Sequence, residues 1–380
     1  MEPRAENRIQ NIFNIILSVL LSLIFSALFC KFYLSKNSTS TESVSNNITI
    51  NTQETSKNEF SVTSKETVIA NIKDSVVEIN CTTTSGTSAG SGVIVGEDTT
   101  KGISYIITNH HVIESASQIK IIFTNKDIAV ATLVGSDPDN DIAVLKVYKS
   151  NLKLATFGNS DNIVLGEDVI VIGNPLGALG GTVSTGIVSC TSREIAISGQ
   201  TMTLIQTNAA INSGNSGGAM FNSNGQLIGI VNAKASALGV EGLGFAIPSN
   251  TAKNVMINLL KTATDTSYGY IEGKTKLGVT FKTTAYGNIF NYVPVIVVSS
   301  VDKGGSCEKA GIKEGDILVS IKIGENTIVA NNNLNDISAF IKNAKLKIDD
   351  KIIITIKKTV EGANQDIEVT MLQYVYNPGV

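Results

Sequence analysis

The chain has 380 residues, of which 42% are apolar and 17% are charged, and its formal net charge is −3. This length suggests two or three folded units, and the apolar share is sufficient for a sizeable core. The net charge gives no whole-chain support for nucleic-acid binding. Glycine is frequent, tryptophan is absent, and many runs are rich in Val, Ile and Thr, which indicates β structure with tight turns.

The N-terminal region contains an apolar run from Ile12 to Cys30 without a charged residue. As a helix this run would be about 28 Å long, close to the hydrocarbon thickness of a bilayer. It is longer than the core of a typical signal peptide, and no clear A-x-A cleavage site follows it. We expect a transmembrane anchor at 12–34 behind a cytoplasmic N-terminus at 1–11, with a cleaved signal peptide as the alternative. The flanking basic residues balance, so charge does not set the orientation.

The segment 35–66 is rich in Ser, Thr and Asn and lacks a sustained apolar period, so we expect a flexible linker. From residue 67 to about residue 248, short β-type runs alternate with Gly, Asn and Asp turns, which predicts a sandwich or a barrel. The clearest runs are Ser91–Val95, Tyr105–Thr108, Gln118–Phe123, Ile142–Val147, Val169–Ile172 and Leu227–Val231.

The C-terminal part has a different pattern, introduced by a helix that we expect to open at Ser249 with this serine as its cap. Its apolar stripe consists of Val255, Met256, Leu259 and Leu260. After a polar connector, a separate small α+β unit is predicted. Its expected strands are Leu277–Phe281, Val295–Val301, Ile317–Ile321, Lys351–Ile356 and Ile367–Leu372, with helices near Cys307–Ala310 and Leu334–Ala344.

Cysteine spacing gives almost no support for a zinc or thioredoxin-type site, because none of Cys30, Cys81, Cys190 and Cys307 forms a CxxC pair. We expect no metal and no cofactor. Free thiols are favoured, and spacing alone leaves a disulfide between Cys81 and Cys190 open.

The strongest local signal is Gly214-Asn215-Ser216-Gly217-Gly218. Glycines around a serine let the backbone turn sharply, and the N–H groups of Gly214 and Ser216 could then meet at a point where an oxyanion binds. The pattern alone also fits the nucleophile elbow of an α/β-hydrolase, or an ordinary turn.

The chain has two histidines, His110 and His111, and both precede Ser216. An α/β-hydrolase places its histidine after the serine, so that option fails and a His–Asp–Ser order remains. A histidine suits this role because its pKa of about 6.5 lets it accept the serine proton and return it to a leaving amine. In an extended strand the two side chains would face opposite sides, so only one could face the serine, and periodicity does not decide which.

An orienting carboxylate should lie between the histidines and the serine. Asp141 is favoured because it directly precedes the apolar run Ile142–Leu145, where a carboxylate can be buried against an imidazole N–H. The other aspartates in this interval are more typical of turns; they are Asp127, Asp137, Asp139, Asp161 and Asp168.

Several segments resemble the motifs of HtrA/DegP-type serine proteases, in the same order along about residues 67 to 375. They are Thr108–Ile113, Asp137–Lys146, Gly173–Gly177, Gly181–Ser189, Gln206–Gly218 and Gly242–Pro248. Farther along, Ser306–Leu318 resembles part of a PDZ domain, and Leu277, Gly278 and Val279 resemble its carboxylate-binding loop.

The resemblance implies a mainly β fold. It predicts a chymotrypsin-like double β-barrel protease domain at 67–262, a connector at 263–275 and one small α+β PDZ domain at 276–375, as in DegS-like members with a single PDZ domain.

The resemblance also implies the site residues. His111 would be the base, because the family's histidine directly precedes a valine, Asp141 would orient it, and Ser216 would be the nucleophile. The backbone of Gly214, Asn215 and Ser216 would form the oxyanion hole. The implied substrate pocket consists of Ala210, Ile211, Asn232, Ala233 and Lys234.

Two positions depart from the family pattern, which usually has Asp where Asn208 stands and Pro where Ser213 stands. Ser213 does not restrict φ as a proline would, so the local loop could be looser. Ala210 lies six residues before Ser216, where trypsin-like enzymes carry a pocket aspartate. This difference argues against cleavage after Lys or Arg, and the resemblance implies a pocket for small aliphatic residues such as Val or Ala.

The function implied is that of an ATP-independent serine endopeptidase in protein quality control and stress response. It would be a single-pass protein of the cell membrane with its protease and PDZ domains outside the cytoplasm. The implied partners are unfolded or damaged polypeptides, C-terminal peptides at the PDZ domain and two further copies in a homotrimer. The alternatives are a non-proteolytic PDZ-bearing chaperone or scaffold, and a dedicated regulatory protease with one membrane-protein substrate.

Overall fold

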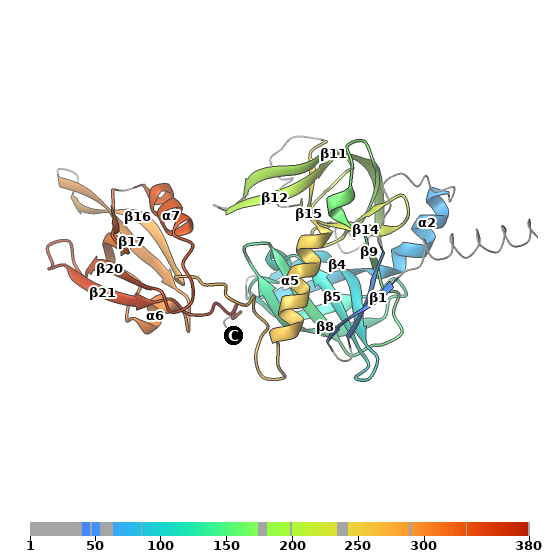
Figure 1. Ribbon diagram of the computed structural model, residues 1–380, viewed down its shortest axis with the longest axis horizontal. Helices are drawn as coiled ribbons and strands as arrows, with labels where there is room; N and C mark the ends of the chain where they lie inside the picture. The colour runs from blue at the N-terminus through green and yellow to red at the C-terminus, as the bar shows by residue number, and fades with distance from the viewer. Residues whose placement is uncertain are drawn as a thin grey trace, which may run out of the picture.

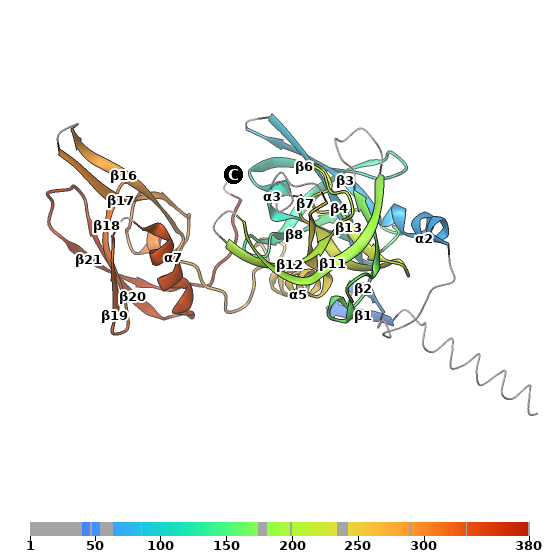
Figure 2. The ribbon, with the colours of Figure 1, turned by 90° about the horizontal axis from the view of Figure 1, so that it is seen from above.

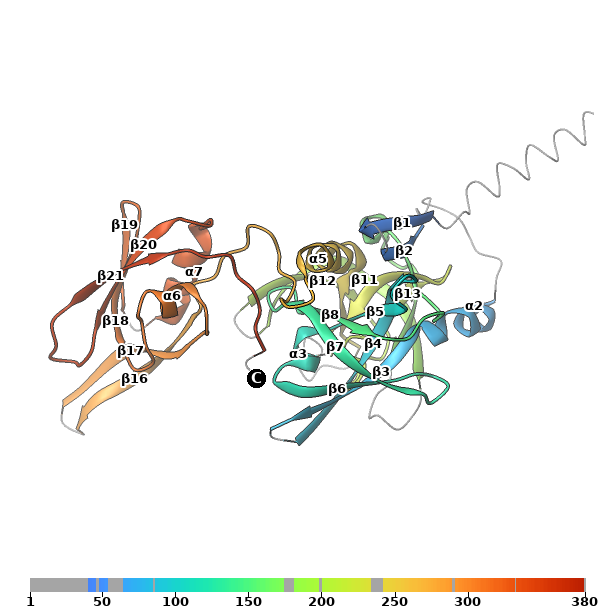
Figure 3. The same ribbon diagram turned by 90° about the horizontal axis from the view of Figure 1, so that it is seen from below.

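The computed structural model describes residues 40–45, 48–53, 64–84, 86–173, 181–197, 200–233, 242–288, 291–331 and 333–378. The predicted N-terminus at 1–11 and anchor at 12–34 lie outside these ranges. Within them, no helix has the length and apolar character needed to cross a membrane. Figure 1 shows a larger body of strands and a smaller body formed by the C-terminal part of the chain, and Figures 2 and 3 show the connector between them from above and below.

The first half of the larger body is a closed antiparallel barrel. Its strands follow the order β4-β3-β6-β7-β8-β5, and β5 pairs back with β4. Its core includes the buried side chains of Ile79, Ile94, Ile106, Ile121 and Leu145. The strands are β3 (Val76–Thr83), β4 (Gly86–Asp98), β5 (Ile103–Thr108), β6 (Ala116–Ile122), β7 (Ile128–Asp137) and β8 (Ile142–Val147).

The second half is another closed barrel, in the order β13-β10-β11-β12-β15-β14 with β14 paired back to β13. Its own core includes Val169, Val171, Ile205, Met220 and Val231. The strands are β10 (Asp168–Gly173), β11 (Thr182–Ile197), β12 (Gln200–Thr207), β13 (Ala219–Asn222), β14 (Gln226–Val231) and β15 (Gly244–Pro248). The predicted mainly β fold, with a double barrel, is therefore observed.

Two short strands join the barrels: β2 (Ile48–Thr52) and β9 (Thr156–Phe157). β2 pairs with β4 of the first barrel and runs parallel to β9, and β9 runs parallel to β14 of the second. β1 (Ser40–Ser45) pairs with the other side of β2. Ile48 and Ile50 are buried in an apolar cluster that also contains side chains of both barrels.

The prediction of a flexible linker over 35–66 is therefore wrong for the residues of β1 and β2. The alternation of Ile48 and Ile50 with polar neighbours is a strand pattern, but it is too short to stand out in a Ser/Thr/Asn-rich segment. Only the available edge of β4 and the apolar space between the barrels make it a strand.

Two longer helices belong to the larger body, α2 (Lys65–Ile72) and α5 (Ser249–Thr262). α5 crosses the face of the body and packs against β7, β8 and β14, with Val255, Met256 and Leu259 buried (Figure 1). The predicted helix and its apolar stripe are confirmed. Its cap is not: the Ser249 hydroxyl donates to the Gly158 carbonyl at 3.0 Å, and Pro248 occupies the N-cap position.

The smaller body is an α+β unit with its own apolar core, as the change of pattern predicts. Its sheet has the order β16-β17-β18-β20-β21, with β19 paired to β18. The elements are β16 (Val279–Asn288), β17 (Asn291–Val301), α6 (Ser306–Lys309), β18 (Ile317–Ile323), β19 (Asn326–Val329), α7 (Leu334–Asn343), β20 (Lys351–Lys357) and β21 (Gln365–Thr370).

The connector between the two bodies is held against the first barrel. The Gly269 N–H donates to the Val134 carbonyl at 2.8 Å. A Cβ at Gly269 would lie 2.0 Å from the Leu259 carbonyl oxygen, so only glycine fits this approach. Lys274 then forms ion pairs with Asp137 and, at 2.7 Å, with Asp139.

The burial of β2 generates a stability prediction. Ile50 is 0% exposed, so Ile50→Ala is expected to lower the free energy of unfolding by about 2–5 kcal/mol through lost burial and a residual cavity. Ile128→Ala is the matched control, because Ile128 is 65% exposed and surface changes usually cost less than about 0.5 kcal/mol. Urea denaturation measures both, and equal midpoints for the two variants would contradict the role given to β2.

Candidate active site

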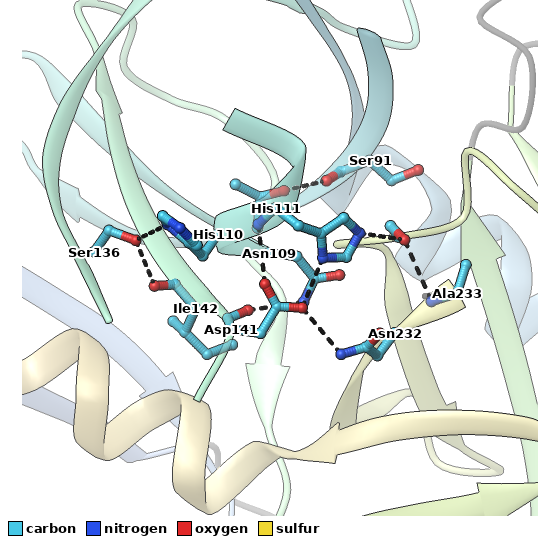
Figure 4. A network of polar contacts seen from close by, with 11 residues as sticks. Ser91, Asn109, His110, His111, Ser136, Asp141, Ile142, Asn232 and Ala233 are labelled. Atoms are coloured by element: carbon cyan, nitrogen blue, oxygen red, sulfur yellow. Dashed lines mark hydrogen bonds and ion pairs between the residues drawn. The ribbon is translucent and has the colours of Figure 1, made fainter. Parts of the chain in front are cut away.

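Asp141, His111 and Ser216 meet at the junction of the two barrels, and Figure 4 shows Asp141 and His111 there. His111 Nδ1 lies 2.7 Å from Asp141 Oδ2, and His111 Nε2 lies 2.9 Å from Ser216 Oγ. Because a carboxylate only accepts hydrogen bonds, Nδ1 carries the proton and Nε2 presents its lone pair to the serine hydroxyl. This arrangement can remove a proton from Ser216 and keep the resulting imidazolium beside a negative charge.

Each of these side chains is placed by a different element. His111 belongs to α3 (His110–Ile113), which follows β5 directly. Asp141 immediately precedes β8 and has a φ of +50°, in the left-handed region that few non-glycine residues adopt. Ser216 lies in the loop before β13 and is 6% exposed. The first barrel therefore supplies the imidazole and the carboxylate, and the second supplies the hydroxyl.

Asp141 is 7% exposed, and its carboxylate is held by several donors. Oδ1 accepts from the His111 backbone N–H at 2.9 Å, and Oδ2 accepts from the Asn232 side-chain amide at 3.0 Å in addition to the imidazole. Its backbone carbonyl accepts from the Asn109 side chain at 3.0 Å. These bonds fix the carboxylate in the plane and position that the imidazole needs, and they offset the cost of burying its charge.

Asn232 has a different position from the one that the sequence suggests. It is expected at the edge of a substrate pocket, yet it is buried and its Nδ2 contacts Asp141. No local pattern could reveal this contact, because the two residues are 91 positions apart and belong to different barrels.

The loop around Ser216 leaves two N–H groups for a ligand. Among the described residues, the N–H groups of Gly214 and Ser216 have no hydrogen-bond partner. By contrast, the Asn215 N–H donates to Asn212 O at 3.0 Å. Asn215 is one of the three residues expected in the oxyanion hole, but its backbone N–H is therefore not available to a ligand. Gly214 has a φ of +95°, a conformation that glycine adopts without strain. Two free N–H groups beside a hydroxyl can bind a developing oxyanion.

The remaining predicted pocket residues surround this loop. Ala210 is exposed, and its carbonyl accepts from the Ser184 hydroxyl at 2.8 Å. Ile211 is half-buried against the core of the second barrel. The Ala233 N–H donates to Ser216 Oγ at 3.3 Å. Lys234 lies outside the described residues.

The two departures from the family pattern lie in the same region. Asn208 Oδ1 accepts from the Ile187 N–H at 2.8 Å, so the amide oxygen supplies the acceptor that a carboxylate would also offer. Ser213 is exposed in the loop that leads to Gly214.

His110 lies in the helical turn α3 rather than in an extended strand, which corrects the geometry expected for the adjacent histidines. Its Nδ1 lies 2.9 Å from Ser136 Oγ, and the Ser136 hydroxyl donates to Ile142 O at 3.1 Å. The imidazole therefore donates to Ser136, and its ring meets the Tyr376 ring edge-on at 4.7 Å. Burial lowers the pKa of His110, so it is neutral at physiological pH.

The predicted carboxylate-binding loop is at the start of β16, in the smaller body. Leu277 is buried and its carbonyl accepts from the Cys307 N–H at 3.0 Å. Gly278 has a φ of +69°, and its carbonyl accepts from the Asp302 N–H at 2.9 Å. Val279 opens β16. Within the described part of the chain, the N–H groups of Leu277 and Gly278 have no hydrogen-bond partner.

The thiols and the acidic side chains of the described part of the chain are candidate ligands of a metal ion. Cys81, Cys190 and Cys307 are free thiols, and burial raises the pKa of Cys81 to about 11. Across the residues that the structure describes, no cluster of His, Cys, Asp and Glu is arranged to hold a metal ion.

With this geometry in place, comparison with known proteins is informative. Residues 90–230 match the model of the trypsin-like peptidase domain. The chain is 40% identical over 241 residues to the serine protease Do-like HtrB of Bacillus subtilis, covering 61% of this chain and 52% of that protein. It is 34% identical over 307 residues to the serine protease Do-like HtrA of Lactococcus lactis subsp. cremoris, covering 74% of this chain and 71% of that protein.

A solved structure of the HtrA-type protease AlgW with a tripeptide is similar in fold. The two structures superimpose with a TM-score of 0.50 at 29% sequence identity, and the match covers 83% of this chain and 99% of the AlgW chain. The matches to the two Bacillus subtilis relatives span about half of their length, at 52% and 54%.

The contact between Asn232 and Asp141 generates a kinetic prediction. Asn232→Ala removes a hydrogen bond to a charged group, a kind of bond that contributes about 1.5–3 kcal/mol. We expect kcat for a peptide substrate to fall about 10- to 100-fold with little change in KM. Asn222→Ala is the matched control, since Asn222 is a buried asparagine that bonds Gln226 within the second barrel. A kcat for Asn232→Ala equal to that of the control would exclude a role in holding Asp141.

Proposed function

Because this chain belongs to the HtrA/DegP-type serine protease family, we propose that it is a serine endopeptidase in which Ser216 is the nucleophile, His111 the general base and Asp141 the orienting carboxylate. The observation that carries this proposal is the pair of short contacts of His111, 2.7 Å to Asp141 and 2.9 Å to Ser216. These distances are those needed for proton transfer within a hydrogen bond.

The steps follow from the positions of the atoms. Ser216 Oγ attacks the scissile carbonyl carbon as its proton moves to His111 Nε2. Asp141 stays ionised and stabilises the imidazolium. The N–H groups of Gly214 and Ser216 hold the oxyanion of the tetrahedral intermediate. His111 then returns the proton to the leaving amine, and water hydrolyses the acyl-enzyme by the same path in reverse.

The substrate preference follows from the side chains beside the nucleophile. Ala210 carries no charge, so nothing at this position would bind a Lys or Arg side chain, and Ile211 adds an apolar wall. We assign a preference for cleavage after small aliphatic residues such as Val or Ala. Unfolded or damaged polypeptides are the proposed substrates, on the ground of family membership.

The smaller body is proposed to be a PDZ domain that binds C-terminal peptides. The N–H groups of Leu277 and Gly278 would take the terminal carboxylate, and β16, at the edge of its sheet, would pair with the peptide backbone. The similar AlgW structure was solved with a tripeptide, which supports a peptide ligand for this chain.

Two further proposals concern place and assembly. The charge-free run within 12–34 would anchor the protein in the cell membrane with both domains outside the cytoplasm. A homotrimer is proposed from family membership alone.

The proposed chemistry predicts that Ser216→Ala lowers kcat for casein or a chromogenic peptide by about 10⁴- to 10⁶-fold while KM stays similar. The loss should occur without a change in thermal unfolding temperature larger than a few degrees, because only one oxygen is removed. Ser213→Ala, a neighbouring serine on the same loop, is the control and should retain activity. Equal cleavage by Ser216→Ala and the parent would refute the enzyme and leave a non-proteolytic peptide-binding protein.

Regulation by the proposed PDZ domain has a structural route. After β21 the chain returns to the first barrel, where Tyr376 packs on His110, the residue beside the proposed base. Along this return, Tyr374 N–H donates to Lys274 O at 2.8 Å, and Lys274 is paired with Asp137, four residues before Asp141. A peptide that shifts the smaller body would therefore move residues next to the proposed base, His111, and near the orienting carboxylate, Asp141.

This route predicts that peptides with free C-terminal carboxylates raise kcat/KM of the parent by about 5- to 150-fold, the usual range of coupling between two sites. Tyr376→Ala should reduce this activation at least threefold while peptide affinity, measured by fluorescence anisotropy, changes little. Tyr148→Ala serves as the control because Tyr148 is an exposed tyrosine of the first barrel. Identical activation curves for Tyr376→Ala and the parent would contradict this route.

A further inference from the structure

We propose that Ser91 is a positioning residue that holds the oxyanion-binding loop in its working conformation, an inference that rests on the proposed peptidase function. Ser91 is fully buried in the middle of β4, in the first barrel. The loop that it contacts belongs to the second barrel. Figure 4 draws Ser91 together with His111 and Asp141.

Ser91 contacts the loop at two points. Its backbone N–H donates to Ser216 O at 2.8 Å, and its hydroxyl donates to Gly214 O at 2.8 Å. The two carbonyls belong to the same residues whose N–H groups are proposed to bind the oxyanion. One residue of the first barrel therefore fixes both ends of the proposed oxyanion hole.

The hydroxyl contact controls one peptide plane. The peptide between Gly214 and Asn215 is held on its oxygen side by Ser91 and on its nitrogen side by the bond from Asn215 N–H to Asn212 O, at 3.0 Å. Among the described residues, no other donor reaches the Gly214 carbonyl. A rotation of this plane would turn the neighbouring N–H groups of Gly214 and Ser216 away from a common point.

The backbone of Ser213 and Gly214, next to this peptide plane, has a wide range of accessible φ and ψ angles. Gly214 adopts a φ of +95° and can populate many other conformations. Ser213 before it does not restrict φ as a proline would. The conformation of the loop is thus not fixed by its own residue types, which leaves the contact with Ser91 to select it.

The packing around Ser91 leaves no room for it to move away. A Cβ added at Gly217 would lie 2.2 Å from the Ser91 carbonyl oxygen, and one added at Gly90 would lie 3.2 Å from Ser216 O. The same Ser91 carbonyl oxygen accepts from the Thr108 hydroxyl at 2.7 Å. β4 is therefore in direct contact with the loop, and the Ser91 hydroxyl is held at the position that the Gly214 carbonyl requires.

The expected effect of losing the hydroxyl is on the transition state. Loss of one oxyanion donor typically lowers kcat about 10²- to 10³-fold. Ser91→Ala keeps both donors but loosens their placement, so a smaller fall of about 10- to 100-fold in kcat is expected, with KM within about twofold. A peptide aldehyde, which forms a hemiacetal oxyanion with the serine, should lose affinity by the same factor as kcat/KM.

The experiment compares Ser91→Ala with Ser104→Ala. Ser104 is a fully buried serine of β5 whose hydroxyl donates to Lys149 O at 2.7 Å, in the same barrel and away from the loop. Both changes remove the hydroxyl of a buried serine that donates to a backbone carbonyl, so both should lower stability, but only Ser91→Ala should lower kcat and aldehyde affinity together. Equal kcat and aldehyde affinity for the two variants would overturn the proposal.

Two additional variants keep the result unambiguous. Ser91→Cys retains a weaker donor of similar size and should show an intermediate fall in kcat. If Ser91→Ala does not fold, Ser91→Cys replaces it in the comparison. A kcat of Ser91→Cys equal to that of the parent would then contradict the proposal. Ser216→Ala in the same assays separates the two levels. An active Ser216→Ala defeats the peptidase itself, whereas an inactive Ser216→Ala with a parent-like Ser91→Ala defeats only the role of Ser91.

Discussion

The hydrogen bond between His111 and Ser216 crosses the junction of two barrels, and the rest of the structure serves to keep that junction closed. At 2.9 Å, this contact tolerates little relative movement of the barrels, because hydrogen bonds weaken steeply with distance and angle. β2 and β9 pair with strands of both barrels, and α5 packs on both. The same buried apolar side chains that stabilise the junction thus hold the geometry of the site.

Polar contacts across the junction complete this alignment. Asn232 of the second barrel donates to the Asp141 carboxylate of the first, and Ser91 of the first barrel donates to the loop that carries Ser216 in the second. The bond from Asn232 holds the carboxylate that orients His111. The bond from Ser91 holds the loop that carries the nucleophile, Ser216. Asn232 and Ser91 are both buried, so leaving either side chain without its hydrogen bond would cost about 1–3 kcal/mol of stability. The two contacts therefore resist any sliding of one barrel past the other.

Much of the fold could be predicted from the sequence, because alternating apolar runs and glycine turns report local conformation directly. The order of histidine and serine excluded the α/β-hydrolase arrangement, whereas the choice of His111 over His110 and the double barrel came from the family resemblance. Contacts that depend on chain segments far apart could not be predicted: β2 becomes a strand only beside β4, and Asn232 reaches Asp141 only when the barrels meet. The sequence predicts Ser249 as the cap of its helix, but it is the first helical residue, Pro248 occupies the N-cap position, and the Ser249 hydroxyl donates to the Gly158 carbonyl. In each case tertiary structure selected among options that the local sequence left open.

The central claim is that His111 activates Ser216 across the junction, and covalent labelling tests it most directly. A fluorophosphonate probe should modify Ser216 as the single serine detected by peptide mass spectrometry. In His111→Ala the rate of labelling should fall about 10³-fold or more, while His110→Ala should still label. Labelling of Ser216 at an unchanged rate without the His111 imidazole, or modification of a different serine, would contradict the account.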